Sequence, residues 1–134
     1  MNRYMARAHA MKLVYEWEMG GEGGEDTRMG LLDIAPEELQ GEDAEFMNRL
    51  VDGVKAGAAD IDGRICAHAK GWQIDRIPRV DLAILRVAVC EMSILDTHKS
   101  IAINEAVELA RQYSTEKAPQ FINGVLGAIA RDGQ

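Results

Sequence analysis

Few residues of this 134-residue chain have the types and spacing that chemistry at a single site requires. Cys66 and His68 stand two residues apart, but no second ligand pair with zinc spacing accompanies them. Glu105 and Glu108 are one helical turn apart and could form a carboxylate pair, although no histidine would share their face. We therefore interpret Cys66 as a buried thiol beside a partly buried histidine, and the two glutamates as solvated surface charges.

A phosphate-binding loop is the second kind of functional site that the sequence could contain. The segment from Gly20 to Glu25 reads GGEGGE, which lacks the lysine and the hydroxyl of a Walker loop. Its glutamates would repel phosphate, so we expect an acidic, mobile loop from Gly20 to Gly30. His9 and His98 have no local acidic or cysteine partner. The sequence therefore favours a binding protein that is not an enzyme and needs neither a metal nor a cofactor.

Composition indicates one globular, helical domain. Apolar residues make up 47% of the chain and charged residues 28%, whereas aromatic residues are only 5%. Alanine is abundant and threonine is rare, a mixture that favours helices over strands. No apolar run approaches the length of a membrane span, and the N-terminus lacks the apolar core of a signal peptide. We expect a cytoplasmic protein with no membrane contact and with reduced cysteines at positions 66 and 90.

The net charge of −7 comes from one segment. Residues 20–62 carry twelve acidic and only three basic side chains, whereas the flanking segments are each slightly basic. Net charge therefore neither supports nor excludes a polyanionic partner. Whether the protein can bind one depends on the charge of an individual face.

Hydrophobic periodicity predicts six or seven short helices and no strand. The segment from Arg79 to about Leu95 is apolar over much of its circumference, so it should be the central helix, and Arg86 within it should need an acidic partner. Asp43 and Ser100 are the expected caps of two other helices. The expected segments are residues 3–19, 31–39, 43–58, 60–71, 79–95, 100–113 and a last helix with Pro119 in its first turn.

Three blocks in the C-terminal half carry a resemblance to a known family. They read RIPRVDLAILRVA at residues 76–88, INEAVELAR at residues 103–111 and FINGVL at residues 121–126. Their order and spacing resemble the NusB family of bacterial transcription antitermination factors. The likeness extends to the opening helix, with Arg3, Arg7 and the stretch from Leu13 to Glu18, and covers nearly the whole chain apart from the acidic loop.

The resemblance implies an all-α, NusB-like fold of about seven helices in two bundles that form one compact domain over residues 1–134. The N-terminal bundle would cover about residues 1–70 and the C-terminal bundle about residues 71–134. The family pairs with NusE, a small-subunit ribosomal protein, and the pair binds the single-stranded boxA element of nascent ribosomal RNA leaders. With NusA, NusG and RNA polymerase, it suppresses premature termination. Whether the free protein is a monomer or a homodimer stays open.

The resemblance also points to RNA-binding residues. Arg3 and Arg7 match two positions of an arginine-rich segment and lie four residues apart, hence on one helical face. Tyr4 and Met5 stand where relatives often have more arginine, so this segment carries little charge. The alternative is that the two arginines are merely solvated residues at a helix start.

A second group of expected RNA contacts lies before the last helix. Lys117 and Gln120 flank Pro119, at a position where the family tunes its boxA affinity. The lysine could offset the low charge of the N-terminal segment, although a loop lysine in water is an equal alternative.

Tyr15, Asp81 and Phe121 match positions implicated in contacting NusE. Tyr15 and Phe121 could instead be core aromatic residues. Asp81 could instead have only a structural role, in which its carboxylate interacts favourably with the positive end of the helix dipole.

Two other functions remain as alternatives. One is a NusB-like RNA-binding adaptor in ribosomal RNA modification or ribosome biogenesis. The other is a helical enzyme that uses His68 or Glu91, for which a structure should show perturbed titratable groups converging in a pocket.

Overall fold

The chain folds as an assembly of helices. The computed structural model describes residues 1–22 and 24–132, so Gly23 of the expected loop lies outside the described residues. The described residues form seven α-helices and two short 3₁₀-helices and contain no strand, which confirms the all-α prediction. The elements are α1 Arg3–Glu18, α2 Glu25–Leu32, η1 Pro36–Leu39, α3 Glu42–Ala56, α4 Ala58–His68, η2 Ile74–Arg76, α5 Arg79–Ser93, α6 Lys99–Tyr113 and α7 Ala118–Asp132.

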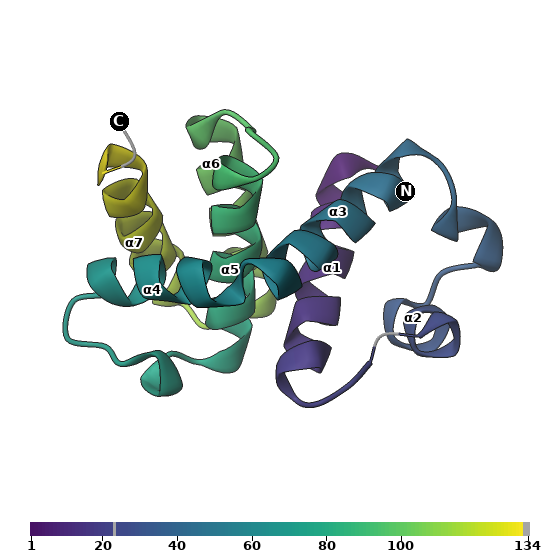
Figure 1. The fold of residues 1–134 in the computed structure, drawn as a ribbon, viewed down its shortest axis with the longest axis horizontal. Helices are drawn as coiled ribbons and strands as arrows, with labels where there is room; N and C mark the ends of the chain where they lie inside the picture. The colour runs from purple at the N-terminus through teal and green to yellow at the C-terminus, as the bar shows by residue number, and fades with distance from the viewer. Residues whose placement is uncertain (23, 133–134) are drawn as a thin grey trace.

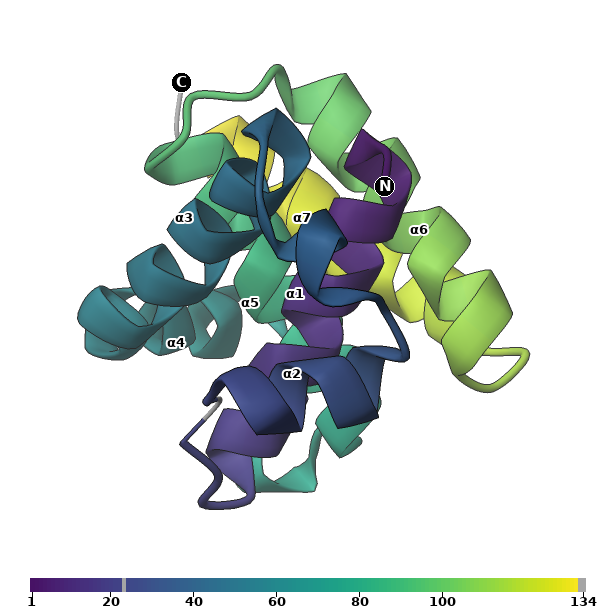
Figure 2. The same cartoon turned by 90° about the vertical axis from the view of Figure 1, so that its right-hand side faces the viewer.

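The helices form two groups that meet at α5. Helices α1, α2 and α3 lie on one side of the molecule and α4, α6 and α7 on the other, with α5 between them (Figure 1). Helix α2 contacts α1 and covers its outer side (Figure 2). Helix α4 packs on α5 and α7, so its contacts group it with the C-terminal helices, although the sequence analysis counted residues up to about 70 with the N-terminal bundle.

Helix α5 is central, as its apolar circumference predicted. Every residue from Asp81 to Glu91 is buried, and the helix contacts α1, α3, α4, α6 and α7. Three of these buried residues are charged, namely Asp81, Arg86 and Glu91. Since successive members are spaced by five residues, each points about 140° around the helix from the one before it. Each therefore has its own polar partners in the surrounding elements.

Three local expectations were wrong. The predicted loop from Gly20 to Gly30 is partly helical, because α2 begins at Glu25 and Leu32 at its end is buried in the core. Tertiary packing thus overrides weak local propensity. Asp43 lies inside the first turn of α3, whose N-cap is Gly41. Helix α6 is capped not by Ser100 but by His98, whose Nδ1 accepts a hydrogen bond from the Ser100 backbone N–H at 3.2 Å.

Gly53 lets α3 approach α5 closely. A Cβ atom at Gly53 would lie 2.6 Å from the Sγ of Cys90. That thiol is fully buried and donates to the carbonyl of Leu50 at 3.6 Å, and burial raises its pKa to about 11. The sulfur therefore has no free space into which to move.

Replacing Gly53 with alanine should lower the free energy of unfolding by about 1–2 kcal/mol, because overpacking outweighs the gain in helix propensity. The matched control is Gly63→Ala in α4, where a Cβ would meet nothing within 4 Å. That control should stabilise the protein by about 0.5–1 kcal/mol. Urea unfolding of both variants checks the pair, and stabilisation by both changes would disprove the close contact.

Candidate nucleic-acid interface

Arg3 lies half-exposed at the start of α1. Its Nη1 donates to the Glu42 carbonyl at 3.2 Å and lies 3.5 Å from a carboxylate oxygen of Asp43. Its guanidinium carbon stands 4.3 Å from the centre of the Phe46 ring. The side chain is nevertheless 49% exposed, so one edge of the guanidinium remains open to solvent.

Arg7 lies on the same helix but is buried. Its Nε donates to Glu91 Oε1 at 2.9 Å and its Nη2 donates to Oε2 at 2.7 Å, and the two side chains are only 9% and 1% exposed. Burial opposes the charge of Arg7, but the hydrogen bond and the charge of Glu91 outweigh it, so the pKa of Arg7 is raised. This geometry makes Arg7 a link between α1 and α5 and leaves its guanidinium little exposed to solvent.

The end of α6 lies beside α1. The Tyr4 hydroxyl donates to the side chain of Gln112, and the Lys12 ammonium stands 5.2 Å from the centre of the Tyr113 ring. The α6–α7 turn, which carries Lys117, follows directly. Lys117 and Gln120 are both exposed, as expected of residues that bind a ligand.

A groove of about 830 Å³ runs between α6 and α7. The sequence analysis missed it, although Asn104 and Asn123 lie in the conspicuous motifs INEAVELAR and FINGVL. Of the expected RNA-binding residues, Gln120 lines this groove, whereas Arg3 lies at the start of α1 against α3. The walls of the groove are rich in amides and hydroxyls. The residues that line it are Asn104, Val107, Glu108, Arg111, Ser114, Thr115, Glu116, Pro119, Gln120 and Asn123.

The three expected partner contacts have different surroundings. Tyr15 is 36% exposed, and it lies three residues from Lys12 and so on a neighbouring part of the α1 surface. Phe121 is partly buried, and its ring meets that of Trp72 edge-on with the ring centres 5.9 Å apart. Asp81 is only 3% exposed and accepts a hydrogen bond from the Ser114 hydroxyl. Burial raises the pKa of Asp81, although the Ser114 bond partly offsets this.

Asp81 therefore does not present its carboxylate to a partner in this structure. Instead it joins the first turn of α5 to Ser114, the residue that ends α6.

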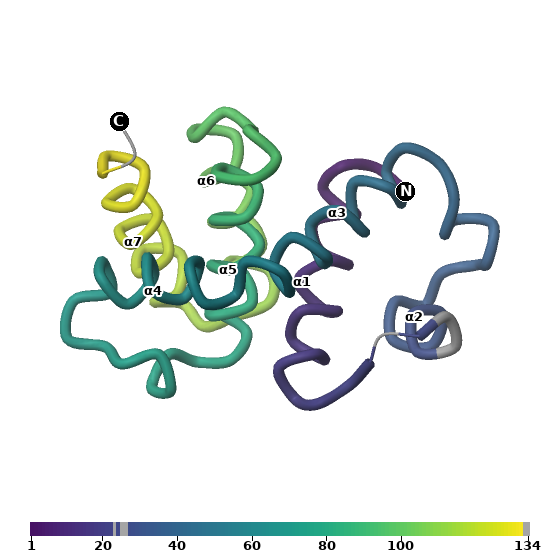
Figure 3. The backbone as a smooth tube through the Cα atoms, viewed as in Figure 1, coloured from purple at the N-terminus to yellow at the C-terminus, as the bar shows by residue number. Residues whose placement is uncertain are grey.

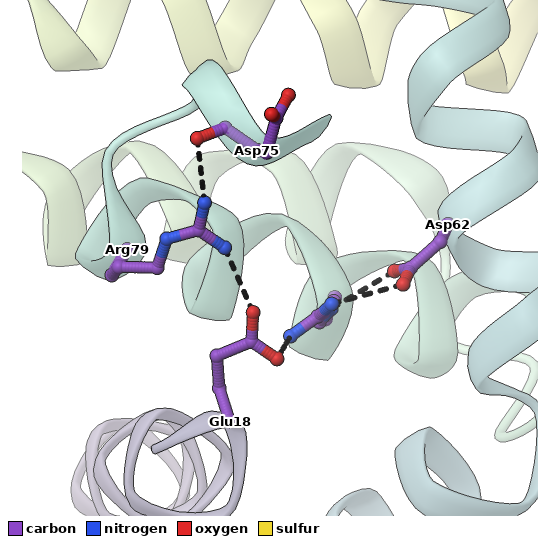
Figure 4. Close-up of polar contacts among 5 residues, drawn as sticks. Glu18, Asp62, Asp75 and Arg79 are labelled. Carbon is purple, nitrogen blue, oxygen red and sulfur yellow. Dashed lines mark hydrogen bonds and ion pairs between the residues drawn. The ribbon is translucent and has the colours of Figure 1, made fainter. Parts of the chain in front are cut away.

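Arg86 has the acidic partners that the sequence analysis required. Its guanidinium donates two bonds to Asp62 of α4, both at 2.9 Å, and a third to Glu18 of α1 at 3.1 Å (Figure 4). The second oxygen of Glu18 accepts from Arg79 at 2.8 Å, and Arg79 also donates to the Asp75 carbonyl. This network joins the end of α1 to α4, α5 and η2.

The remaining titratable candidates do not converge on one pocket. His68 contacts the Asp132 carboxylate at 2.5 Å and the Arg64 carbonyl at 2.9 Å. Both contacts raise the pKa of His68, and the contact with the Arg64 carbonyl has the larger effect. Glu91 is held by Arg7. Cys66 is exposed, so the expectation of a buried thiol there was wrong: the position faces outward from α4.

His9 is a buried group with no hydrogen-bond partner among the described residues at either ring nitrogen. Burial lowers its pKa, which keeps the imidazole neutral in the folded protein. Among the residues whose side chains the structure describes, no cluster of three suits a metal ion, and no helix in the described part of the chain has the length and apolarity of a membrane span.

Comparisons with known proteins agree over the whole chain. The profile of the NusB family matches residues 5–131. The transcription antitermination protein NusB of Acetivibrio thermocellus is 42% identical, over 98% of this chain and 90% of that protein. The NusB protein of Clostridium botulinum strain Loch Maree is 37% identical, over 96% of this chain and 99% of its own length.

Solved structures extend the likeness to three dimensions. The crystal structure of the antitermination factors NusB and NusE in complex with dsRNA contains a chain that is 31% identical, with a TM-score of 0.81 and coverage of 98% of this chain and 99% of that one. T. maritima NusB is 27% identical, with a TM-score of 0.82 and coverage of 98% and 92%. The chain therefore belongs to the NusB family.

Proposed function

We propose that this protein is a transcription antitermination factor that binds the boxA element of nascent ribosomal RNA leaders together with NusE. The observation that carries the proposal is the full-length similarity to a chain in a complex of NusB, NusE and RNA. In this proposal the protein acts in the cytoplasm, and NusA, NusG and RNA polymerase join the assembly on the transcript.

The exposed residues suggest how RNA is held. Arg3 and Lys117 provide cations for phosphates, and Gln120 provides an amide at the edge of the groove. Arg7 contributes indirectly, since its ion pair with Glu91 fixes the helix that carries Arg3. With only two such cations, the logarithm of RNA affinity should fall with the logarithm of salt at a slope of only about −1 to −2. So few contacts favour a partner that extends the site.

Tyr15 and Phe121 are the proposed contacts to NusE. Both are aromatic residues with partly exposed rings, which is the type of side chain enriched at protein interfaces. Asp81 would support this surface from beneath through Ser114.

Fluorescence anisotropy with a labelled boxA oligonucleotide tests the proposal. We expect weak binding by the protein alone and much tighter binding after NusE is added, because the partner extends the RNA site. Single-stranded and duplex forms of the oligonucleotide should be compared, since the solved complex holds duplex RNA. An affinity that NusE does not change would refute the heterodimer mechanism.

Lys117→Glu should weaken boxA binding by the complex, because it replaces a phosphate contact with a charge that repels phosphate. The matched control is Lys55→Glu, a lysine in the last turn of α3. The same anisotropy titration measures both variants. Equal losses would show that Lys117 acts only through net charge.

A further inference from the structure

Trp72 is an exposed tryptophan next to a turn. It is 48% exposed and belongs to the connector between the end of α4 at His68 and the start of α5 at Arg79. Figure 3 shows the path of this connector. Gly71 has a φ of +76°, a conformation that favours glycine, and the Trp72 backbone N–H donates to the Ala69 carbonyl at 2.9 Å. The turn therefore holds the backbone of Trp72 in a defined position.

The indole ring is also held from one side. Phe121 of α7 meets it edge-on, with an angle of 61° between the ring planes. An edge-on contact covers only part of a ring, in agreement with the half-exposed side chain. Packing thus orients the ring and leaves apolar surface open to solvent, a geometry that suits a flat ligand.

An open cavity of about 320 Å³ adjoins the ring. Its lining comprises Gly71, Trp72, Gln73 and Arg76, so the aromatic ring is accompanied by an amide and a guanidinium. These are the groups that bind an unstacked nucleobase: a ring for stacking and polar side chains for the base edge.

The charge of the connector also favours a polyanion. Arg76 and Lys70, the residue before Gly71, are both exposed, and neither makes an ion pair with another described residue. Asp75 is the single acidic residue between Gly71 and Pro78. Lys117 adds a further cation nearby, because it precedes Phe121 by one helical turn and accepts the Phe121 backbone N–H.

We propose that Trp72 is a stacking platform for one unpaired base of the single-stranded RNA, with Arg76 and Gln73 binding the phosphate or the base edge. This inference rests on the proposed RNA-binding function and extends the RNA site to the α4–α5 connector, which the sequence analysis treated only as a linker. Tryptophan and arginine are also enriched at protein interfaces, so the binding of NusE is measured beside that of RNA.

Tryptophan fluorescence gives the direct test. The chain has two tryptophans, Trp17 and Trp72, so a Trp17→Phe background isolates the emission of Trp72. In the complex with NusE, single-stranded boxA RNA should quench this emission and saturate at the same concentration as the anisotropy titration. A fully paired duplex of the same sequence should leave it unchanged, because its bases are already stacked.

Affinity measurements with variants supply the second readout. Trp72→Ala should weaken binding of single-stranded boxA RNA to the complex about tenfold or more, and Trp72→Phe should retain part of the affinity. Ile101→Ala is the matched control, since Ile101 is an apolar residue of α6 that is 49% exposed. Binding of NusE in the absence of RNA should be the same for the unaltered protein, Trp72→Phe and Ile101→Ala, because phenylalanine keeps a ring packed on Phe121. The same measurement on Trp72→Ala shows whether the loss of this ring contact affects NusE.

The outcomes separate the two proposals. If the unaltered complex binds RNA but Trp72→Ala binds equally well and no quenching occurs, the stacking platform is wrong and the proposed function stands. If Trp72→Ala weakens binding of NusE without affecting RNA, the surface is a protein interface and the platform is also wrong. If the unaltered complex binds no RNA, both proposals fail.

Discussion

Replacing Glu91 with alanine should lower the free energy of unfolding by about 3–5 kcal/mol, because it leaves a buried guanidinium without its counter-charge. Arg7 makes its closest ion pair with Glu91, at 2.7 Å, whereas Glu105 is 3.9 Å away. Neither Arg7 nor Glu91 has appreciable contact with water, so solvent cannot replace the lost interaction. Urea unfolding followed by circular dichroism measures the effect.

Glu108→Ala is the control for this prediction. Glu108 pairs with Arg111 on the surface of α6, where both side chains are more than half exposed, so its removal should change stability by no more than about 0.5 kcal/mol. Similar losses for the two variants would contradict the assignment of Arg7 and Glu91 as a buried pair.

The double variant Arg7→Met, Glu91→Leu separates stability from RNA binding. Apolar replacement of both members of a buried pair is often nearly neutral for stability. If Arg7 acts only by positioning α1, the double variant should bind boxA RNA with NusE as tightly as the unaltered protein. A clear loss of RNA affinity with intact folding would show that Arg7 contacts RNA directly.

Replacing Arg86 with methionine should cost about 3 kcal/mol of stability. The change removes both bonds to Asp62 and the bond to Glu18, which together join α4 and α1 to the central helix (Figure 4). The loss should be smaller than that for Glu91→Ala, because the two carboxylates left behind are partly hydrated, at 27% and 28% exposed.

Arg79→Met tests the outer branch of the same network. Arg79 is 30% exposed and binds Glu18 and the Asp75 carbonyl, so its loss should cost about 1 kcal/mol or less. Denaturant unfolding of both variants should show a larger loss of stability for Arg86→Met than for Arg79→Met. Equal losses for Arg79→Met and Arg86→Met would mean that burial does not determine the contribution of each arginine.

The central position of α5 follows from local sequence. An apolar pattern around most of a helix is visible in consecutive residues, and it requires that the helix be covered on all sides. The same pattern showed that Arg86 must have an acidic partner, and Asp62 and Glu18 provide it. Helix positions were likewise predicted within a few residues, with two exceptions. Helix α2 forms where a loop was expected, because packing of Leu32 outweighed a glycine-rich sequence. The helix expected at residues 31–39 is divided between the end of α2 and the 3₁₀-helix η1.

Which side chains pair with each other, and which are exposed, depends on the tertiary structure. Arg7 and Glu91 are 84 residues apart in the chain, and no local pattern indicates that they meet. For the same reason, the sequence could not show that Arg7 and Asp81 are buried whereas Trp72 is exposed. A helical repeat reports which residues share a face, but which element covers that face depends on contacts between distant segments. The family resemblance named the candidate residues, and the packing around α5 decided which of them can reach a ligand.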